Sequence, residues 1–307
     1  MLSPSLIDQF RLTVLERGLH LHGLHVWQEG QGEVAHRWIN EDPDNVWSVS
    51  KTVTALGVGM CLDEGRLSLG DRVVDFFPAS VTAQAAEGSE EITVRDLLHM
   101  AGGKEFSPWF EETDEKTLET TDWVELFFRS PQVSKPGTHF FYANNCTYML
   151  GRIVASLTGG TLRDYLLPRF FYPLGIYNPQ WQISPDGHTL AASGLQVTTT
   201  QLSRIGRLLL DGGRWEGEQL VSADYVEAMA TDTIPQNGHF PDEESNAGYG
   251  YQVWRNTVPG TFRADGMYGQ FIIVVPEKRA VVTTTSHEEA AAHDIVRYAF
   301  RDIIDHL

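Results

Sequence analysis

The chain has 307 residues, 42% of them hydrophobic and 11% aromatic, and is therefore long enough to bury a large core. It carries 41 acidic and 23 basic side chains, which give a formal net charge of −18 at pH 7. This acidic balance without basic clusters argues against nucleic-acid binding, and no apolar run of about 20 residues is present that would span a membrane.

Two features of the sequence bear on the cellular compartment. Residues 1–20 mix charged with apolar side chains, unlike a secretory signal. If residue 1 is the natural start, we expect a cytoplasmic protein; a signal peptide removed earlier would change that expectation. The two cysteines, Cys61 and Cys146, each fall in an apolar, helix-like stretch, and we expect buried reduced thiols rather than a disulfide or a metal site.

Hydrophobic periodicity places the predicted strands near the two ends of the chain and most of the predicted helices between them. The predicted elements are a helix at residues 6–15, a strand hairpin at 19–27 and 33–39, strands or strand pieces at 249–255, 261–263, 270–275 and 280–285, and a closing helix at 288–304. We expect the two ends to build one antiparallel sheet with helices on it. The expected fold class is therefore α/β, in the α+β sense.

A serine and a lysine stand one helical turn apart where a polar loop gives way to an apolar run, in the sequence Trp-Ser-Val-Ser-Lys at residues 47–51. Because positions i and i+3 share a helix face, the Lys51 amine is expected beside the Ser48 hydroxyl. A buried lysine can lose its proton near neutral pH and activate the serine as a nucleophile. The Ser48 N–H, at a helix start, could also hold an oxyanion. The alternative is that Ser48 caps the helix and Lys51 is solvated.

A tyrosine and an asparagine two residues apart, Tyr142 and Asn144, lie in the loop before a second apolar helical run. Polar side chains in such a loop can point into a cleft. A phenol close to a lysine ammonium is expected to have a lowered pKa and to shuttle protons. The Asn144 amide can bind an acyl or amide group. The alternative is a tyrosine packed by its ring and an asparagine that caps the helix.

Two glycines, Gly266 and Gly269, bracket a short connection into the β-prone segment at residues 270–275. Glycine beside a strand permits a close approach of the backbone to a ligand. The N–H of Met267 could then be a second donor to an oxyanion. The alternative is a plain glycine bulge.

Together, Ser48-x-x-Lys51, Tyr142-x-Asn144 and the glycine-bearing strand follow the order and approximate spacing of the serine β-lactamase and penicillin-binding-protein superfamily. The chain resembles above all its class C β-lactamase-related branch, which includes family VIII carboxylesterases and 6-aminohexanoate-dimer hydrolases. Other segments are similar to motifs of that branch: LLHMAGG at 97–103, PLGI at 173–176 and SGLQVT at 193–198.

The resemblance implies a β-lactamase/DD-peptidase-like fold, with a cleft between two lobes and Ser48 at its floor. We expect residues 1–75 and 245–307 to form a lobe around the central antiparallel sheet, and residues 76–244 to form a mostly helical lobe, as a single catalytic unit. The implied chemistry is two-step acyl transfer. Ser48 attacks a carbonyl, Lys51 and Tyr142 relay its proton, and the N–H groups of Ser48 and Met267 hold the oxyanion. Which of Lys51 and Tyr142 is the resting base stays open.

One departure from the family concerns the substrate. Where β-lactamases and DD-peptidases carry Lys-Thr-Gly, this chain has Ala264-Asp265-Gly266. The usual lysine helps to bind a substrate carboxylate, and the net negative charge of this chain would repel anionic substrates. We therefore expect a carboxylesterase-like serine hydrolase that acts on a small neutral ester or amide. The alternatives are a β-lactamase or D-amino-acid peptidase and, in a different class, a non-catalytic binding protein that uses the same cleft.

The remaining predictions concern binding. Asn144, Gly266, Gln270 and Trp109 are expected to contact the substrate, with the acidic run at residues 111–115 as a possible rim of the cleft. No cofactor or metal ion is expected, because the histidines near residue 20 lack further ligands in the pattern. The expected partner is a small-molecule ester or amide, not nucleic acid or a membrane. The sequence leaves the oligomeric state open.

Overall fold

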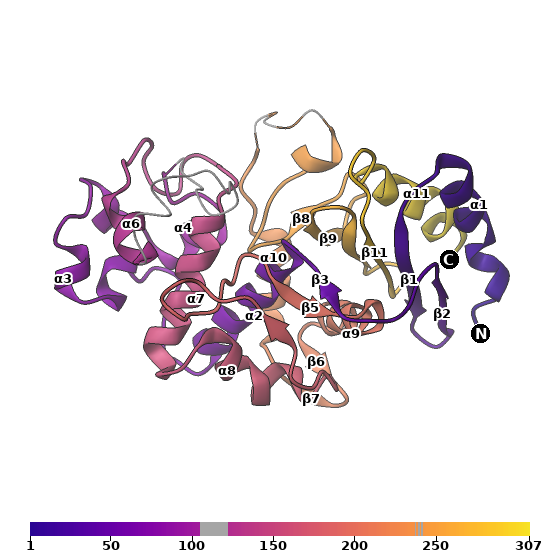
Figure 1. Ribbon diagram of the computed structural model, residues 1–307, viewed down its shortest axis with the longest axis horizontal. Helices are drawn as coiled ribbons and strands as arrows, with labels where there is room; N and C mark the ends of the chain where they lie inside the picture. Colours follow the sequence, from indigo (N-terminus) through magenta and orange to yellow (C-terminus); the bar gives the residue numbers. More distant parts are fainter. Residues whose placement is uncertain (105–121, 237, 239, 241) are drawn as a thin grey trace.

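A six-stranded antiparallel sheet, built from the two ends of the chain, forms one side of the molecule (Figure 1). The computed structural model describes residues 1–104, 122–236, 238, 240 and 242–307. From one edge to the other, the strands are β2 (Gly32–Arg37), β1 (Leu21–Gln28), β11 (Ala280–Ser286), β10 (Gln270–Val275), β9 (Phe262–Gly266) and β8 (Trp254–Arg255). The antiparallel sheet expected from the periodicity is therefore confirmed.

The central strand β10 shows how the sheet divides the core. Phe271, Ile273 and Val275 point to one face, where they pack with residues of α1 (Asp8–Arg17) and α11 (Asp294–Asp302). Ile272 and Val274 point to the opposite face and join the larger core. Because successive side chains of a strand alternate between faces, one apolar strand supports both layers.

The helix α9 (Thr199–Leu210) covers that second face and contacts β1, β10 and β11. This helix belongs to residues 76–244, which we predicted to form the mostly helical lobe. Its Gly206 allows the close packing, because a Cβ there would lie 2.5 Å from Val281 and 2.6 Å from Ile272. The sheet is thus covered on both faces by helices.

Two long helices cross the centre of the molecule, α2 (Val49–Asp63) and α7 (Asn144–Thr158), and they pack against each other. Residues 49–61 of α2 are all buried, including the polar Ser50, Lys51, Thr52 and Thr54 of its first turns. The shorter described helices are α3 (Ala79–Thr82), α4 (Val94–Leu98), α6 (Trp123–Arg129), α8 (Leu162–Leu166) and α10 (Ala223–Thr231).

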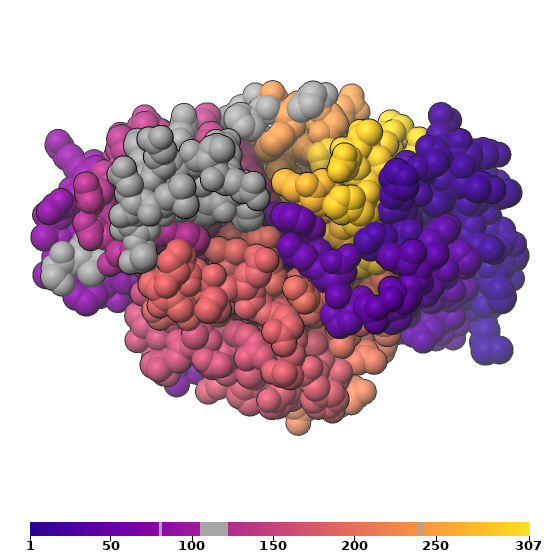
Figure 2. Space-filling model, in the orientation of Figure 1, coloured from indigo at the N-terminus to yellow at the C-terminus, as the bar shows by residue number. Residues whose placement is uncertain are grey.

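Short strand pairs complete the described structure. They are β3 (Asp44–Asn45), β5 (Leu195–Val197) and β4 (Gln180–Trp181) in one small sheet, and β6 (Arg214–Trp215) with β7 (Glu218–Gln219) in another. In the space-filling view, both chain ends lie on one side of the molecule, and the helical segments from the middle of the chain lie on the other (Figure 2).

Two predicted elements are shorter than expected. The closing helix begins at Asp294 rather than at 288, because the Glu288 carboxylate accepts hydrogen bonds from the N–H groups of Ala290 and Ala291 (3.0 and 3.1 Å) and holds them in a turn. The predicted strand at 249–255 is reduced to β8. Its earlier part is diverted because the Tyr251 N–H donates to the carbonyl of Met229 (3.0 Å).

The expectations for the cysteines agree with the structure, since Cys61 and Cys146 are both free and buried. In the part of the chain that the structure describes, no helix is long and apolar enough to cross a membrane. Within the same residues, no group of three or more histidine, cysteine, aspartate or glutamate side chains is arranged to hold a metal ion.

Candidate active site

The first turn of α2 brings Ser48 and Lys51 together. Ser48 is the N-cap residue, and its carbonyl accepts a hydrogen bond from the Lys51 N–H (3.0 Å), which closes that turn. The Lys51 side chain is buried, with 1% of its surface exposed. Its Nζ donates to Ser48 Oγ at 2.7 Å and to the carbonyl of Ala192 at 2.8 Å. These two hydrogen bonds fix the position of the amine next to the serine hydroxyl.

Burial also changes the protonation of this lysine. It lowers the pKa of the Lys51 ammonium to about 7, because the charged form loses its solvation, while the Asp265 carboxylate raises that pKa. A large fraction of Lys51 is therefore a neutral amine near neutral pH. In that form the nitrogen can accept the proton of the Ser48 hydroxyl.

Tyr142 completes a cluster of three polar side chains. It lies just before α7, its ring centroid is 5.1 Å from Lys51 Nζ, and the Ser48 side chain is near enough to its hydroxyl to lower its pKa. Burial raises the pKa of Tyr142, with a smaller opposing effect from the Ser48 side chain. The expectation of a lowered pKa was therefore wrong, because the loss of solvation outweighs that effect.

Aromatic packing fixes the Tyr142 ring in place. Trp254 of β8 stacks on it, with ring centroids 5.4 Å apart and planes at 30°, and Tyr249 meets it edge-on at 6.0 Å. Asn144, the first residue of α7, lies two positions further on and is partly buried. Sequence reasoning missed Trp254, since no local pattern ties it to a loop more than a hundred residues earlier.

The hairpin turn between β9 and β10 approaches the start of α2. A Cβ on Gly266 would lie 2.4 Å from the carbonyl oxygen of Val46, so only glycine permits this contact of the two backbones. Met267 follows directly, with its side chain 53% exposed. Among the described residues, neither the Ser48 N–H nor the Met267 N–H donates a hydrogen bond to another group of the protein. Both donors are therefore available to a ligand.

Gln270 and Trp109 are two of the predicted substrate contacts. Gln270 is 1% exposed, and its side-chain amide donates to the carbonyls of Ser286 and Met267 and accepts from the Ser286 N–H. Its side chain therefore links the turn between β9 and β10 to the end of β11, and it does not face a ligand. Trp109, together with the acidic run at residues 111–115, lies outside the described residues.

The segment that departs from the family motif contains a buried ion pair. Arg263, 1% exposed, donates from Nε to Asp265 Oδ2 at 2.9 Å and from Nη1 to Asn256 Oδ1 at 2.9 Å. Ala264 between them is also 1% exposed and pairs with Ile272 across the ladder. The Arg263 guanidinium is therefore neutralised by the Asp265 carboxylate, two residues further along the same strand.

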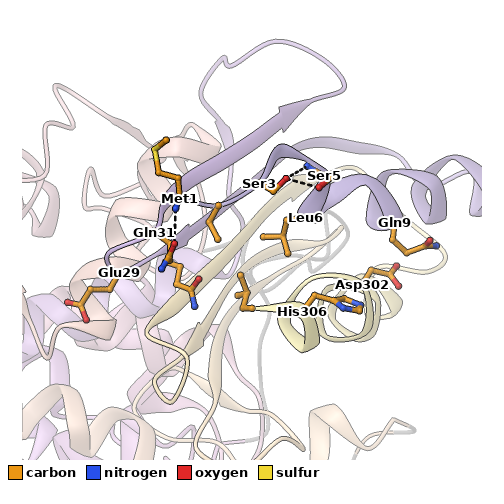
Figure 3. Close-up of a pocket in the computed structure, with 12 residues that line it drawn as sticks. Met1, Ser3, Ser5, Leu6, Gln9, Glu29, Gln31, Asp302 and His306 are labelled. Carbon is orange, nitrogen blue, oxygen red and sulfur yellow. Dashed lines mark hydrogen bonds between the residues drawn. The ribbon is translucent and has the colours of Figure 1, made fainter.

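A pocket of about 470 Å³ lies against the turn at residues 265–268. The connection from β11 to α11, residues 288–294, forms its other side, and the acidic residues that line it are Asp265, Glu288, Glu289 and Asp294. Among the described residues that line it there is no lysine or arginine, and Ser48, Lys51 and Tyr142 are not among them either. A separate pocket of about 700 Å³, between the two chain termini, contains none of the site residues named above (Figure 3).

Comparison with known proteins agrees with this geometry. The profile of the Beta-lactamase family matches residues 28–303. The chain belongs to the Beta-lactamase family. Similar members of known name include the 6-aminohexanoate-dimer hydrolase of Paenarthrobacter ureafaciens, 23% identical over 257 residues that cover 78% of this chain and 65% of that protein. The lovastatin esterase of Penicillium rubens is 26% identical over 185 residues, which cover 54% of this chain and 46% of the esterase.

Comparison with a solved structure confirms the fold. The octameric penicillin-binding protein homologue from Pyrococcus abyssi matches with a TM-score of 0.75 at 20% identity, over 98% of this chain and 77% of that one. The chain spans less than two thirds of the length of the two curated relatives named above. The fold expected from the motifs is therefore established, and the activity is a matter for proposal.

The Asp265 carboxylate gives this site a testable pH dependence. Because its negative charge raises the pKa of Lys51, Asp265→Asn is expected to lower that pKa. If Lys51 is the base, the rising limb of the kcat/KM profile should then move to lower pH, by up to about 1 pH unit. Asp305→Asn removes an exposed carboxylate and serves as the control of equal charge. A limb that stays in place, or moves to higher pH, would contradict the role of Asp265.

Proposed function

We propose that this protein is a serine hydrolase that acts through an acyl-enzyme intermediate on a small neutral ester or amide. The observation that carries the proposal is the contact between Ser48 Oγ and the buried Lys51 Nζ at 2.7 Å, with the Tyr142 ring centroid 5.1 Å from the same nitrogen. A solvated lysine or a simple helix cap would have no need of this burial. The names of the relatives, an esterase and a dimer hydrolase, support the same class of reaction.

In the first step, the neutral Lys51 amine accepts the proton of Ser48 as Oγ attacks the substrate carbonyl. The pKa of about 7 for Lys51 and the raised pKa of Tyr142 support Lys51 as the resting base, with Tyr142 protonated. Tyr142 then gives its proton to the departing alcohol or amine and is reprotonated from the Lys51 ammonium. Water releases the acid by the same steps in reverse order.

The negative charge that develops on the carbonyl oxygen is held by the N–H groups of Ser48 and Met267. Both belong to backbone that is fixed before the substrate arrives, so they need little reorganisation as the charge develops. In other enzymes, loss of one such donor costs roughly 3–4 kcal/mol of transition-state stabilisation. The exposed position of Met267, 53% of whose surface is accessible, supports access of a ligand to this point.

The charges around the site favour a neutral substrate. Ala264 cannot bind a carboxylate, and Arg263 is occupied by Asp265. The net charge of −18 adds long-range repulsion of anions. These features make β-lactams and D-alanyl termini, which carry carboxylates, poor substrates.

The substrate preference can be measured with matched chromogenic compounds. We expect kcat/KM for p-nitrophenyl butyrate to exceed that for the p-nitrophenyl hemiester of succinic acid by at least about tenfold. A tenfold difference corresponds to about 1.4 kcal/mol, roughly the cost of one unfavourable contact between like charges. Nitrocefin is expected to be slower than either ester. Added salt should narrow the difference between the two esters, because it screens the repulsion. Faster turnover of nitrocefin than of the butyrate ester would contradict the proposed substrate class.

A further inference from the structure

The two proposed oxyanion donors are flanked by two aromatic residues with unusual backbone. Trp47 directly precedes Ser48, and Tyr268 directly follows Met267. Both have positive φ, 48° for Trp47 and 67° for Tyr268, a conformation that bulky side chains rarely adopt. Strained backbone of this kind persists only where surrounding contacts determine it, and it gathers at functional sites.

The rings of these two residues meet. The Trp47 and Tyr268 centroids lie 5.2 Å apart with planes at 75°, an edge-to-face contact. On its other side, the Tyr268 ring stacks on His287, which follows β11, at 4.4 Å and 17°. We call the Trp47–Tyr268 pair the aromatic clamp. It is a side-chain link between the segment that carries the Ser48 N–H and the segment that carries the Met267 N–H.

The backbones of the same two segments also touch. Gly266 approaches the Val46 carbonyl so closely that no Cβ would fit. The turn that follows is held on its far side, where the Tyr268 carbonyl accepts from the Glu288 N–H (3.0 Å) and the Gly269 carbonyl accepts from Thr284 Oγ1 (2.9 Å). The clamp adds a side-chain contact between the same two segments.

We propose that Trp47 and Tyr268 are positioning residues that set the spacing and direction of the two oxyanion N–H groups. The proposal rests on the acyl-transfer function proposed above. Neither ring needs to touch the reacting atoms, because each acts through the peptide group next to it. Loss of the clamp should therefore weaken the binding of the tetrahedral transition state much more than the binding of the substrate.

The test compares Trp47→Ala, Tyr268→Ala and the double variant with wild type, using p-nitrophenyl butyrate. Each single variant is expected to lower kcat by roughly 10- to 100-fold with little change in KM. The affinity for phenylboronic acid, which forms a tetrahedral adduct with the serine, should fall by the same factor. Because either ring alone makes no clamp, the double variant should be no slower than the slower single variant.

Two further variants separate positioning from general stability. Tyr268→Phe keeps the ring contact and should retain activity within about threefold of wild type. Tyr177→Ala removes one ring of the exposed Tyr172–Tyr177 pair and is the control for loss of an aromatic contact elsewhere. If an alanine variant does not fold, Trp47→Leu and Tyr268→Leu carry the same test, since leucine fills space but cannot make the edge-to-face contact.

Several outcomes would overturn the clamp. They are additive losses in the double variant, a rise in KM that accounts for the loss, or unchanged affinity for phenylboronic acid. Labelling of Ser48 by a fluorophosphonate distinguishes this failure from failure of the proposed function. If wild type does not label, the proposed function and the clamp both fall. If wild type is labelled and the alanine variants are labelled equally fast, only the proposed role of the aromatic clamp is wrong.

Discussion

Replacement of Ser48 by alanine is expected to lower kcat/KM for p-nitrophenyl butyrate by roughly 10⁴- to 10⁶-fold, as loss of the nucleophile does in other serine hydrolases. The reason is that the Ser48 hydroxyl is the proposed nucleophile and lies 2.7 Å from the Lys51 Nζ that would accept its proton. The change removes a single oxygen from a partly buried N-cap residue that makes no side-chain capping bond, so the fold should persist. Steady-state hydrolysis by the two proteins, prepared identically, measures the effect.

Ser156→Ala is the matched control for this change. Ser156 also lies on a central helix, and its hydroxyl donates to the carbonyl of Ile153 on its own helix (2.8 Å). We expect this variant to keep wild-type turnover. Equal activity of wild type and Ser48→Ala would mean that Ser48 is not the nucleophile, and the proposed site would be wrong.

Replacement of Lys51 by methionine is expected to have two opposite effects. Loss of the general base should lower kcat by roughly 10²- to 10⁴-fold. The free energy of unfolding should rise at the same time, because methionine can occupy a buried position without the cost of burying an ammonium. A gain in stability with a loss of activity is typical of a residue that is kept for chemistry rather than for folding.

The sign of the pH dependence follows from the lowered pKa of Lys51. The folded state begins to lose this proton at about pH 7, and the unfolded state only near 10.5, so the unfolded state binds more protons between these values. The stability of wild type therefore increases over this window. The advantage of Lys51→Met in Tm should be largest below pH 7 and should disappear as the pH approaches 10.5.

Thermal unfolding of both proteins across this pH range measures the effect, with Lys135→Met as control for an exposed lysine. We expect a difference of several degrees at pH 6. A variant that keeps ordinary turnover would show that Lys51 is not the base. A variant that is less stable than wild type at pH 6 would show that the buried amine stabilises the fold.

The parts of the site that the sequence predicted are those with a local signal. Ser48 and Lys51 lie one helical turn apart, so their contact follows from the geometry of a helix. Tyr142 and Asn144 stand at the loop-to-helix boundary that periodicity placed before α7. The run of β-prone residues at 270–275 predicted β10, which is buried along its whole length.

The features that could not be predicted from the sequence depend on contacts between distant segments. The Ala192 carbonyl contacts Lys51 from 141 residues away, and Trp254 of β8 stacks on Tyr142 in the loop before α7. The direction of the Tyr142 pKa depends on burial, which no local pattern gives. The closing helix was predicted to start too early because the capture of two N–H groups by Glu288 has no signature in periodicity.

The central claim is that the reaction passes through an acyl group on Ser48. Its most direct test is to quench the reaction with p-nitrophenyl butyrate in acid within the first turnovers, and to locate the added mass by peptide mapping. The account predicts one butyryl group per chain, on the peptide that contains Ser48, and none in Ser48→Ala. Hydrolysis with no adduct, or with the adduct on another residue, would contradict it.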